Sequence, residues 1–193
     1  LPLFKAGFKG IVGMTGDSQG RVFLGFKDVG LFQYTYSTKR VTQLDDGKKI
    51  DVPTIQYFLN DVLDENYFWI CSNSGLTRWD KTKNDTVYIR PKSLLPALAT
   101  NNVSRVAQDQ HGDLYFINSK KICRVHHDDL ALDTLPSSIR IEGNVQGMDI
   151  SKNILWIGTR EGVYRYDLST QEGKEIFFKN AAIGSSGLSV DTF

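Results

Sequence analysis

The sequence predicts an all-β fold, a β-propeller fragment of about four four-stranded antiparallel blades. Two observations lead to this fold class. A chemical pattern recurs along the chain at spacings of 46, 46 and 41 residues, and each copy alternates short apolar runs with turns rich in Asp, Asn and Gly. No helical period is sustained anywhere in the chain. Four short strands in a repeat of this length are typical of a propeller blade.

The repeat is clearest in two segments that agree position by position in chemical type. Residues 156–167 read Trp-Ile-Gly-Thr-Arg-Glu-Gly-Val-Tyr-Arg-Tyr-Asp, and residues 69–80 read Trp-Ile-Cys-Ser-Asn-Ser-Gly-Leu-Thr-Arg-Trp-Asp. Residues 23–34 hold a version that is one residue longer, and residues 115–125 hold a degenerate one. The aromatic anchors of the four copies are Phe23, Trp69, Tyr115 and Trp156.

Each copy is expected to begin with an apolar strand, as in residues 103–107 or 145–150, which ends in a tight hairpin turn. The turns fall at residues 17–20, 64–66, 109–112 and 151–153. Asp and Asn side chains cap turns of this kind, and Gly supplies a positive φ. The first two strands of each blade are therefore expected to form a hairpin.

The second strand carries the aromatic anchor and leads through a short loop into a third strand. In three copies the loop ends at a glycine: Gly30, Gly75 and Gly162. The third strand ends at Tyr34, Trp79, Val125 or Tyr166. A more variable fourth strand, as in residues 86–89 or 175–178, closes the blade.

These signals place the blades at about residues 8–50, 51–98, 99–141 and 142–183, with residues 184–193 starting a further blade. Residues 3–8 resemble a last strand and the turn that follows it. Closed propellers have four to eight blades, so four and a fraction predicts a fragment. Its two open blade faces are expected to make the chain self-associate or leave it marginally stable.

Composition excludes several other classes of protein. Hydrophobic residues make up 40% and charged residues 23% of the 193 residues, which is typical of a globular chain rather than a disordered one. The net charge of +1 provides no basic face, so we expect no nucleic-acid partner. No apolar run is long enough to span a membrane, and the N-terminus lacks the layout of a signal peptide. Cys71 and Cys123 lie in apolar strand-like runs and are expected to be buried free thiols rather than a disulfide.

The best copy, Leu155-Trp156-Ile157-Gly158-Thr159 followed by Gly162-Val163-Tyr164-Arg165-Tyr166-Asp167, resembles the two-component regulator propeller repeat. The copy at 69–80 matches well, and the resemblance covers essentially the whole chain. The first copy departs from the repeat at Gln33, which replaces the arginine. The third copy has Asn118-Ser119 in place of Gly-Thr and Lys121 in place of the second glycine, which leaves its second loop undefined.

The resemblance implies a place in the periplasmic sensor region of bacterial hybrid two-component histidine kinases. In such proteins, two propellers and a small β-sandwich precede a transmembrane helix, a kinase and a response regulator. The resemblance further implies a membrane-anchored parent protein, an oligosaccharide ligand released from a polysaccharide, and signal transmission without catalysis by this chain. Its partners would be the remaining blades of the parent propeller or a second copy of the chain. The ligand class rests on analogy alone.

The motif residues are interpreted as the blade skeleton. The strand aromatics Trp69, Trp156, Tyr34, Trp79 and Tyr166 are expected in the core rather than as platforms for sugars. Arg78, Arg124 and Arg165 recur at one position of the third strand, which favours structural hydrogen bonding or stacking over ligand binding.

Ligand contacts are expected in the loops between second and third strands and in the connections between blades, where blades differ while the skeleton repeats. The candidates share amide, hydroxyl or charged groups that hydrogen-bond sugar hydroxyls. They are Lys27, Asp28, Gln56, Tyr57, Asn73, Ser74, Asn101, Asn102, Asn144, Gln146, Arg160 and Glu161. Each also fits an ordinary solvated loop.

Two other function classes stay open at this stage. A protein-interaction scaffold is the main alternative, although only Trp79-Asp80 supplies the dipeptide of WD repeats. A propeller glycosidase or lyase would need converging carboxylates, and Asp61, Asp149 and Glu161 show no spacing that brings them together. We expect no catalytic residues and no cofactor. We also expect no metal site, because the adjacent His126 and His127 would point to opposite faces of a continuing strand and could not share an ion.

Overall fold

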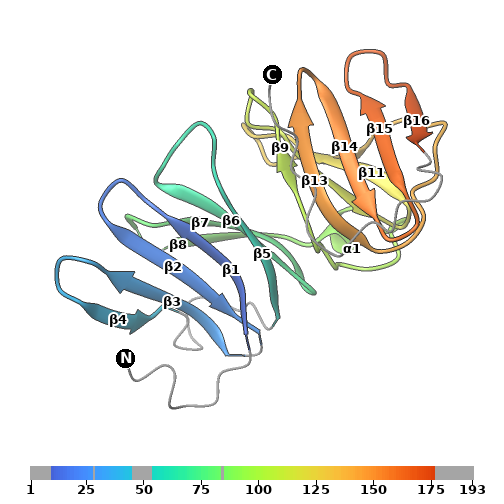
Figure 1. Ribbon diagram of the computed structural model, residues 1–193. Helices are drawn as coiled ribbons and strands as arrows, with labels where there is room; N and C mark the ends of the chain where they lie inside the picture. The colour runs from blue at the N-terminus through green and yellow to red at the C-terminus, as the bar shows by residue number, and fades with distance from the viewer. Residues whose placement is uncertain (1–9, 28, 45–53, 84, 177–193) are drawn as a thin grey trace. The chain divides into compact units, whose positions relative to one another are not determined.

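The computed structural model describes residues 10–27, 29–44, 54–83 and 85–176, which form sixteen strands and one short helix (Figure 1). The elements are β1 (Ile11–Gly16), β2 (Arg21–Phe26), β3 (Gly30–Thr35), β4 (Arg40–Gln43), β5 (Ile55–Asn60), β6 (Tyr67–Ser72), β7 (Gly75–Asp80), β8 (Asp85–Ile89), α1 (Pro91–Leu94), β9 (Ala107–Gln108), β10 (Leu114–Asn118), β11 (Lys121–Val125), β12 (Leu132–Thr134), β13 (Val145–Ser151), β14 (Ile154–Thr159), β15 (Val163–Asp167) and β16 (Gly173–Ile176).

The strands form four antiparallel sheets of four strands, each sheet in chain order: β1 to β4, β5 to β8, β9 to β12 and β13 to β16. This arrangement confirms the predicted all-β propeller fragment. The chain divides into two compact units. One holds residues 1–90 with 101–104, and the other holds residues 91–100 with 105–193.

The hairpin turns form where the Asp, Asn and Gly residues predict them. The carboxylate Oδ1 of Asp17 accepts hydrogen bonds from the backbone N–H groups of Gln19 and Arg21, at 3.0 and 2.9 Å. Asp109 accepts the equivalent bonds in the third sheet. In the fourth sheet, Lys152 and Asn153 both have positive φ, which is the geometry of a two-residue hairpin turn.

The loop between the second and third strands is closed in two different ways. In the fourth sheet the Thr159 hydroxyl accepts the N–H of Gly162 and donates to its carbonyl, both at 3.1 Å. Ser72 donates to the Gly75 carbonyl in the same way, at 3.0 Å. The third sheet instead uses Ser119 and Lys120 with both residues at positive φ, a two-residue turn. The copy that lacks Gly-Thr therefore keeps a loop of the same length as the loop 73–74 of the second sheet, but closes it through positive φ at both residues.

The core of the first unit lies between the sheets β1–β4 and β5–β8. Phe23 packs against Phe68 and edge-on against Trp79, with ring centroids 5.2 and 5.4 Å apart. Gly25 leaves room for the ring of Phe58, because a Cβ at position 25 would lie 2.5 Å from Phe58 Cζ. Buried aromatic pairs of this kind stabilise by roughly 0.5–1.5 kcal/mol beyond the area that they bury.

The core of the second unit lies between β9–β12 and β13–β16. Leu155, Ile157 and Tyr166 of the fourth sheet are completely buried, together with residues of the third sheet such as Tyr115 and Ile122. The hydroxyl of Tyr166 donates to the carbonyl of Pro136, so the polar end of this buried ring is satisfied.

Three expectations need correction in detail. The strand expected over residues 103–107 is only the two-residue β9, because Val103 hydrogen-bonds Ser72 of the first unit instead of a neighbour in the third sheet.

Trp69, Trp79 and Tyr166 are in the core as predicted, but Tyr34 and Trp156 are half-buried. Their registers, opposite Val41 and Arg165, place them on the sheet faces away from the two cores.

Both cysteines are buried free thiols, as predicted. Burial raises the pKa of Cys123 to about 12, so this thiol is inert.

Some expectations fall outside the described residues. These are the strands or connections expected at residues 3–8, 177–178 and 184–193, and the site candidate Asp28. In the described part of the chain, no helix has the length and hydropathy needed to cross a bilayer.

Candidate ligand-binding site

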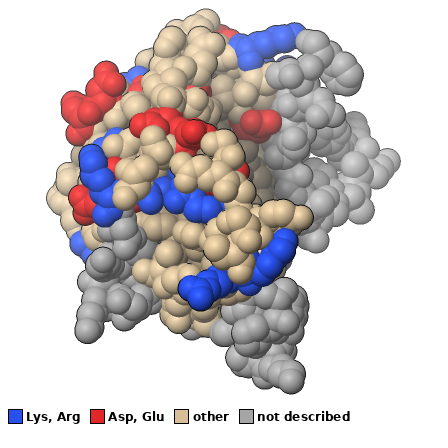
Figure 2. Space-filling model, turned by 90° about the vertical axis from the view of Figure 1, so that its left-hand side faces the viewer, with Lys and Arg blue, Asp and Glu red and all other residues tan. Residues whose placement is uncertain are grey.

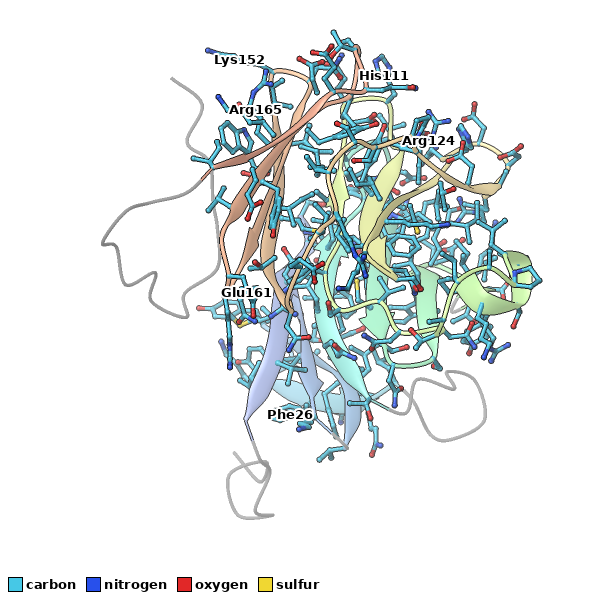
Figure 3. All side chains as sticks on the ribbon, turned by 90° about the vertical axis from the view of Figure 1, so that its right-hand side faces the viewer. Phe26, His111, Arg124, Lys152, Glu161 and Arg165 are labelled. Carbon is cyan, nitrogen blue, oxygen red and sulfur yellow. The ribbon has the colours of Figure 1, made fainter. Side chains whose placement is uncertain are left out.

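We call the end of each sheet that carries the loop between its second and third strands the loop end. The opposite end, with the hairpin turn between the first and second strands, is the turn end. In Figure 3, Glu161 lies at the loop end of β13–β16 and Lys152 lies at its turn end. Antiparallel pairing also brings the start of each first strand to the loop end, since Ile55 pairs with Ser72 and Val145 with Thr159.

In the first unit, the connection residues and the loop of the second sheet come together at the loop end. The Gln56 side chain donates to Asn102 Oδ1 at 2.6 Å. The N–H of Val103 donates to the carbonyl of Ser72 at 2.9 Å, which fixes the segment that carries Asn102 beside the loop 73–74. Asn73 is exposed, and the N–H of Ser74 is held by the Ser72 hydroxyl.

The remaining candidates of the first unit are Tyr57, Asn101 and Lys27. Tyr57 and Asn101 are half-buried, Tyr57 in β5 and Asn101 in the connection. Lys27 is exposed at the loop end of the first sheet, between β2 and β3. The structure thus gathers Gln56, Asn73 and Asn102 into one polar patch, with Ser74 at its edge.

The second unit has its own loop-end patch at β13–β16. Asn144 is exposed, its carbonyl accepts the Gln146 side-chain amide at 3.3 Å, and Arg105 donates to the Gln146 carbonyl at 3.2 Å. Arg160 and Glu161 are exposed in the adjoining loop. The Glu161 carboxylate lies directly over Gly143, where a Cβ would overlap it.

An ion-pair cluster beside this patch is absent from the sequence predictions. Glu142 pairs with Lys120 and with Arg140 Nε, the latter at 3.1 Å, and its N–H donates to the Tyr164 hydroxyl at 3.2 Å. Lys120 comes from the two-residue turn of the third sheet. The one sequence signal for this cluster is the loss of the glycine loop in the third copy. The pairing of Lys120 with Glu142 joins residues of neighbouring blades, so a local sequence pattern does not predict it.

Charge is mixed over the surface. Figure 2 shows Lys and Arg interspersed with Asp and Glu on the described part of the face that it presents. This mixed distribution agrees with the net charge of +1.

The third-strand arginines have structural contacts, as predicted. Arg124 forms a two-pronged pair with Asp133, at 3.2 Å from Nε and 2.7 Å from Nη2. Arg165 donates to Asp167 at 3.3 Å. Arg78 instead stacks on the ring of Tyr67, with its guanidinium carbon 4.9 Å from the ring centroid.

The histidine pair, His126 and His127, lies in a turn after β11, and both side chains are half-buried. The two ring nitrogens of His126 each lie 3.5 Å from a carboxylate, that of Asp113 or that of Asp133. The N–H of His127 donates to Asp113. Among the described residues, no three His, Cys, Asp or Glu side chains are grouped to hold a metal ion.

The carboxylates considered for catalysis have structural partners. Asp61 accepts the N–H groups of Leu63 and Asp64 and the indole N–H of Trp69, the last at 2.8 Å. Asp149 accepts the N–H of Ile150 within the middle of β13, whereas Glu161 lies at the loop end of the same unit.

Two pockets lie away from every sequence-predicted site residue. A pocket of about 190 Å³ in the first unit is lined by Tyr67, Arg78, Asp80, Lys83, Asp85 and Val87. A pocket of about 130 Å³ at the turn end of the second unit is lined by Gln108, Asp109, Gln110, Ile150, Lys152 and Asn153.

Comparison with known proteins identifies the fold. No protein-family model matches the sequence, and a search of curated proteins found no match. Among solved structures, the extracellular domain of the putative hybrid two-component system BT3049 from B. thetaiotaomicron superposes with a TM-score of 0.69 at 16% identity, over 88% of this chain. The corresponding domain of BT4673 from the same organism gives a TM-score of 0.70 at 14% identity, over 89% of this chain.

A third similar structure has a different role. PorZ, a surface component of the type-IX secretion system of Porphyromonas gingivalis, superposes with a TM-score of 0.63 at 14% identity, over 91% of this chain. The chain spans 24% of the length of the two sensor domains and 23% of PorZ. At these identities the likeness shows the shared fold alone.

Proposed function

We propose that this chain is a non-catalytic segment of the extracytoplasmic sensor region of a hybrid two-component histidine kinase. The observation that carries the proposal is the likeness of its four sheets to the extracellular domains of two such systems. The repeat at residues 156–167, which resembles the two-component regulator propeller repeat, supports it independently. On this proposal the chain lies in the periplasm, its parent protein is anchored in the membrane, and further blades accompany it.

The proposed ligand is an oligosaccharide released from a polysaccharide, contacted at the loop ends. Amides at Asn73, Asn102 and Asn144 and the charged pair of Arg160 and Glu161 offer donors and acceptors to sugar hydroxyls. These residues differ from blade to blade while the strands repeat, which suits a specific ligand better than a structural role.

A glycan-binding screen tests the proposal. We expect at least one polysaccharide-derived oligosaccharide to bind by calorimetry, and Asn73→Ala or Arg160→Ala to weaken that binding about tenfold or more. The matched controls Gln19→Ala and Glu172→Ala remove exposed side chains at the turn ends and should bind as the wild-type does. Absence of binding to every oligosaccharide tested, by a protein that is folded, would refute the glycan assignment.

PorZ supports a second candidate, a protein-interaction scaffold at the cell surface. Saturable binding of a defined protein partner, with no response to glycans, would favour this scaffold. Hydrolysis or elimination of a polysaccharide, lost on replacing a single carboxylate such as Asp149, would instead make the chain an enzyme.

A further inference from the structure

The 190 Å³ pocket in the first unit is lined in part by Arg78, which, among the described residues, has no carboxylate partner such as Arg124 and Arg165 have. In the third sheet, Arg124 of β11 lies in register with Asp133 of β12, and the two side chains pair. In the second sheet, Arg78 of β7 lies in register with Val87 of β8. The residue that supplies the internal carboxylate in one blade is therefore apolar in the other.

No other carboxylate replaces it among the described residues. Asp80 occupies the position of Asp167, which pairs with Arg165 in the fourth sheet. In the second sheet, however, Asp80 Oδ1 accepts the hydroxyl and N–H of Thr82, at 2.6 and 2.8 Å, and its other oxygen lies 3.6 Å from the Lys83 ammonium. The carboxylate of Asp85 accepts the N–H of Thr86. Neither forms an ion pair with Arg78, and the interactions of its guanidinium with described residues are with aromatic rings.

Those rings hold the guanidinium in place at the pocket. Arg78 stacks over Tyr67 at 4.9 Å and over Trp69 at 5.8 Å, and Trp69 is itself completely buried and hydrogen-bonded to Asp61. A guanidinium fixed on aromatic rings keeps its forked N–H donors available at little further entropy cost. Arg78 is thus preorganised to bind a carboxylate through two parallel hydrogen bonds.

We propose that this pocket binds the carboxylate of an acidic sugar, a hexuronate. The sugar carboxylate would take the place on Arg78 that Asp133 takes on Arg124. Asp80, Asp85 and Lys83 on the pocket wall offer acceptors and donors to hydroxyls, and Val87 offers an apolar contact. The pocket is smaller than the 300–1,000 Å³ typical of drug-sized ligands, so it takes one sugar unit. This inference rests on the proposed function for its ligand class, but it assigns a site separate from the loop ends.

Calorimetry or NMR titration of the whole chain with D-glucuronate tests the site. Glucuronate or galacturonate should bind, while glucose and the methyl ester of glucuronate, which lack the charge, should bind at least about tenfold more weakly. Acetate should bind more weakly than the uronates, because it lacks the ring. Equal affinity for glucose and glucuronate, equal affinity for acetate and glucuronate, or no binding of either uronate overturns the proposal.

The decisive variant is Val87→Asp, which supplies the missing internal carboxylate. Val87 is 41% exposed, so the change empties no core position. We expect V87D to weaken uronate binding about tenfold or more and to raise the midpoint of urea unfolding. Arg78→Gln should also weaken binding. The matched control is Thr42→Asp, which adds the same carboxylate at the equivalent register position of the first sheet, opposite Gln33 instead of an arginine.

The variants also separate this inference from the proposed function. Asn73→Ala and Arg160→Ala should leave uronate binding unchanged, because both residues lie at loop ends. Uronate binding that survives V87D and R78Q but is lost in a loop-end variant overturns the pocket while leaving the proposed function standing. Uronate binding that depends on Arg78, with no glycan bound at the loop ends, supports the pocket alone.

Discussion

Asp80 and Asp167 end the third strands of two blades and hold the next turn through the same side-chain geometry. Asp80 accepts the N–H groups of Thr82 and Lys83, and Asp167 accepts those of Ser169 and Thr170. Asp80 is the more buried of the two, at 7% exposure. The Thr82 hydroxyl, followed by these N–H groups and the Lys83 charge, outweighs burial and lowers the pKa of Asp80 to about 2.

This pKa predicts acid sensitivity at one residue. Because the folded-state pKa lies below the ordinary value of 3.8, the ionised carboxylate stabilises the fold above about pH 4. That stabilisation, roughly 2 kcal/mol, is lost as the pH falls from about 4 to about 2. Asp80→Asn should therefore be less stable than the wild-type at pH 7, and the difference in unfolding free energy should shrink toward pH 2.

Urea unfolding followed by circular dichroism at several pH values measures this difference. Thr170→Ala, at an exposed position of the turn held by Asp167, serves as a control that leaves the charge of both aspartates unchanged. A difference between Asp80→Asn and wild-type that is constant from pH 7 to pH 2 would contradict the prediction.

The hairpin loops show how one motif position takes different conformations in different sheets. Gly75 and Gly162 align in the repeat, and both close a loop organised by a Ser or Thr hydroxyl. Gly75 has a φ of +135°, and a Cβ there would overlap the carbonyl oxygen of Ile89. A Cβ at Gly162 would find its nearest atom, Glu175 Oε1, at 3.6 Å, which is ordinary contact.

Alanine at these two positions should have unequal effects. We expect Gly75→Ala to lower the free energy of unfolding by more than about 2 kcal/mol, because it adds backbone strain and a clash with main-chain atoms. Gly162→Ala should change it by less than about 1 kcal/mol. Chemical denaturation of the two variants beside the wild-type measures the contrast, and equal losses would show that the loop can relax around the Cβ.

At the scale of the whole molecule, the first unit has a sheet face that turns away from its core. On β1–β4, Phe23 points into the core, whereas Val22 and Leu24 lie on the opposite face beside Met14, which is 67% exposed. An apolar face of this kind suits another sheet as a neighbour. Self-association through blade faces stays a prediction of the sequence.

Light scattering across a range of concentrations tests that prediction. We expect the mean mass to rise with concentration, and Met14→Lys to reduce the rise by placing a charge on the apolar face. Thr42→Lys, on the other face of the same sheet, should leave the rise unchanged. A constant monomer mass at high concentration would contradict the expectation of self-association.

Most of the fold could be predicted from the sequence because its signals are local. The Asp turns, the aromatic strands and the four-strand repeat all depend on residues close together in the chain. The first strand of the third blade is shorter than predicted, because the backbone of Val103 hydrogen-bonds to Ser72, a contact between residues far apart in sequence. The half-burial of Trp156 likewise depends on which sheet covers its face.

The candidate site was predictable only in part. Sequence reasoning selected loop residues, and the structure brings Gln56, Asn73 and Asn102 together in one unit and Arg160 and Glu161 beside Gly143 in the other. Their role in binding stays a prediction. The ion-pair cluster at Glu142 and the pocket at Arg78 were missed, because each is defined by a cross-strand or cross-blade neighbour.

The sequence by itself determined the number of strands, their order and the turns between them, since backbone conformation in a repeat follows from nearest-neighbour chemistry. Tertiary structure alone decided what each repeated residue does. Arg78, Arg124 and Arg165 occupy one motif position, yet one stacks on Tyr67 beside a pocket and the others pair with carboxylates. The physical reason is that a side chain's partner lies across the sheet or on the next blade, where the local pattern carries no information.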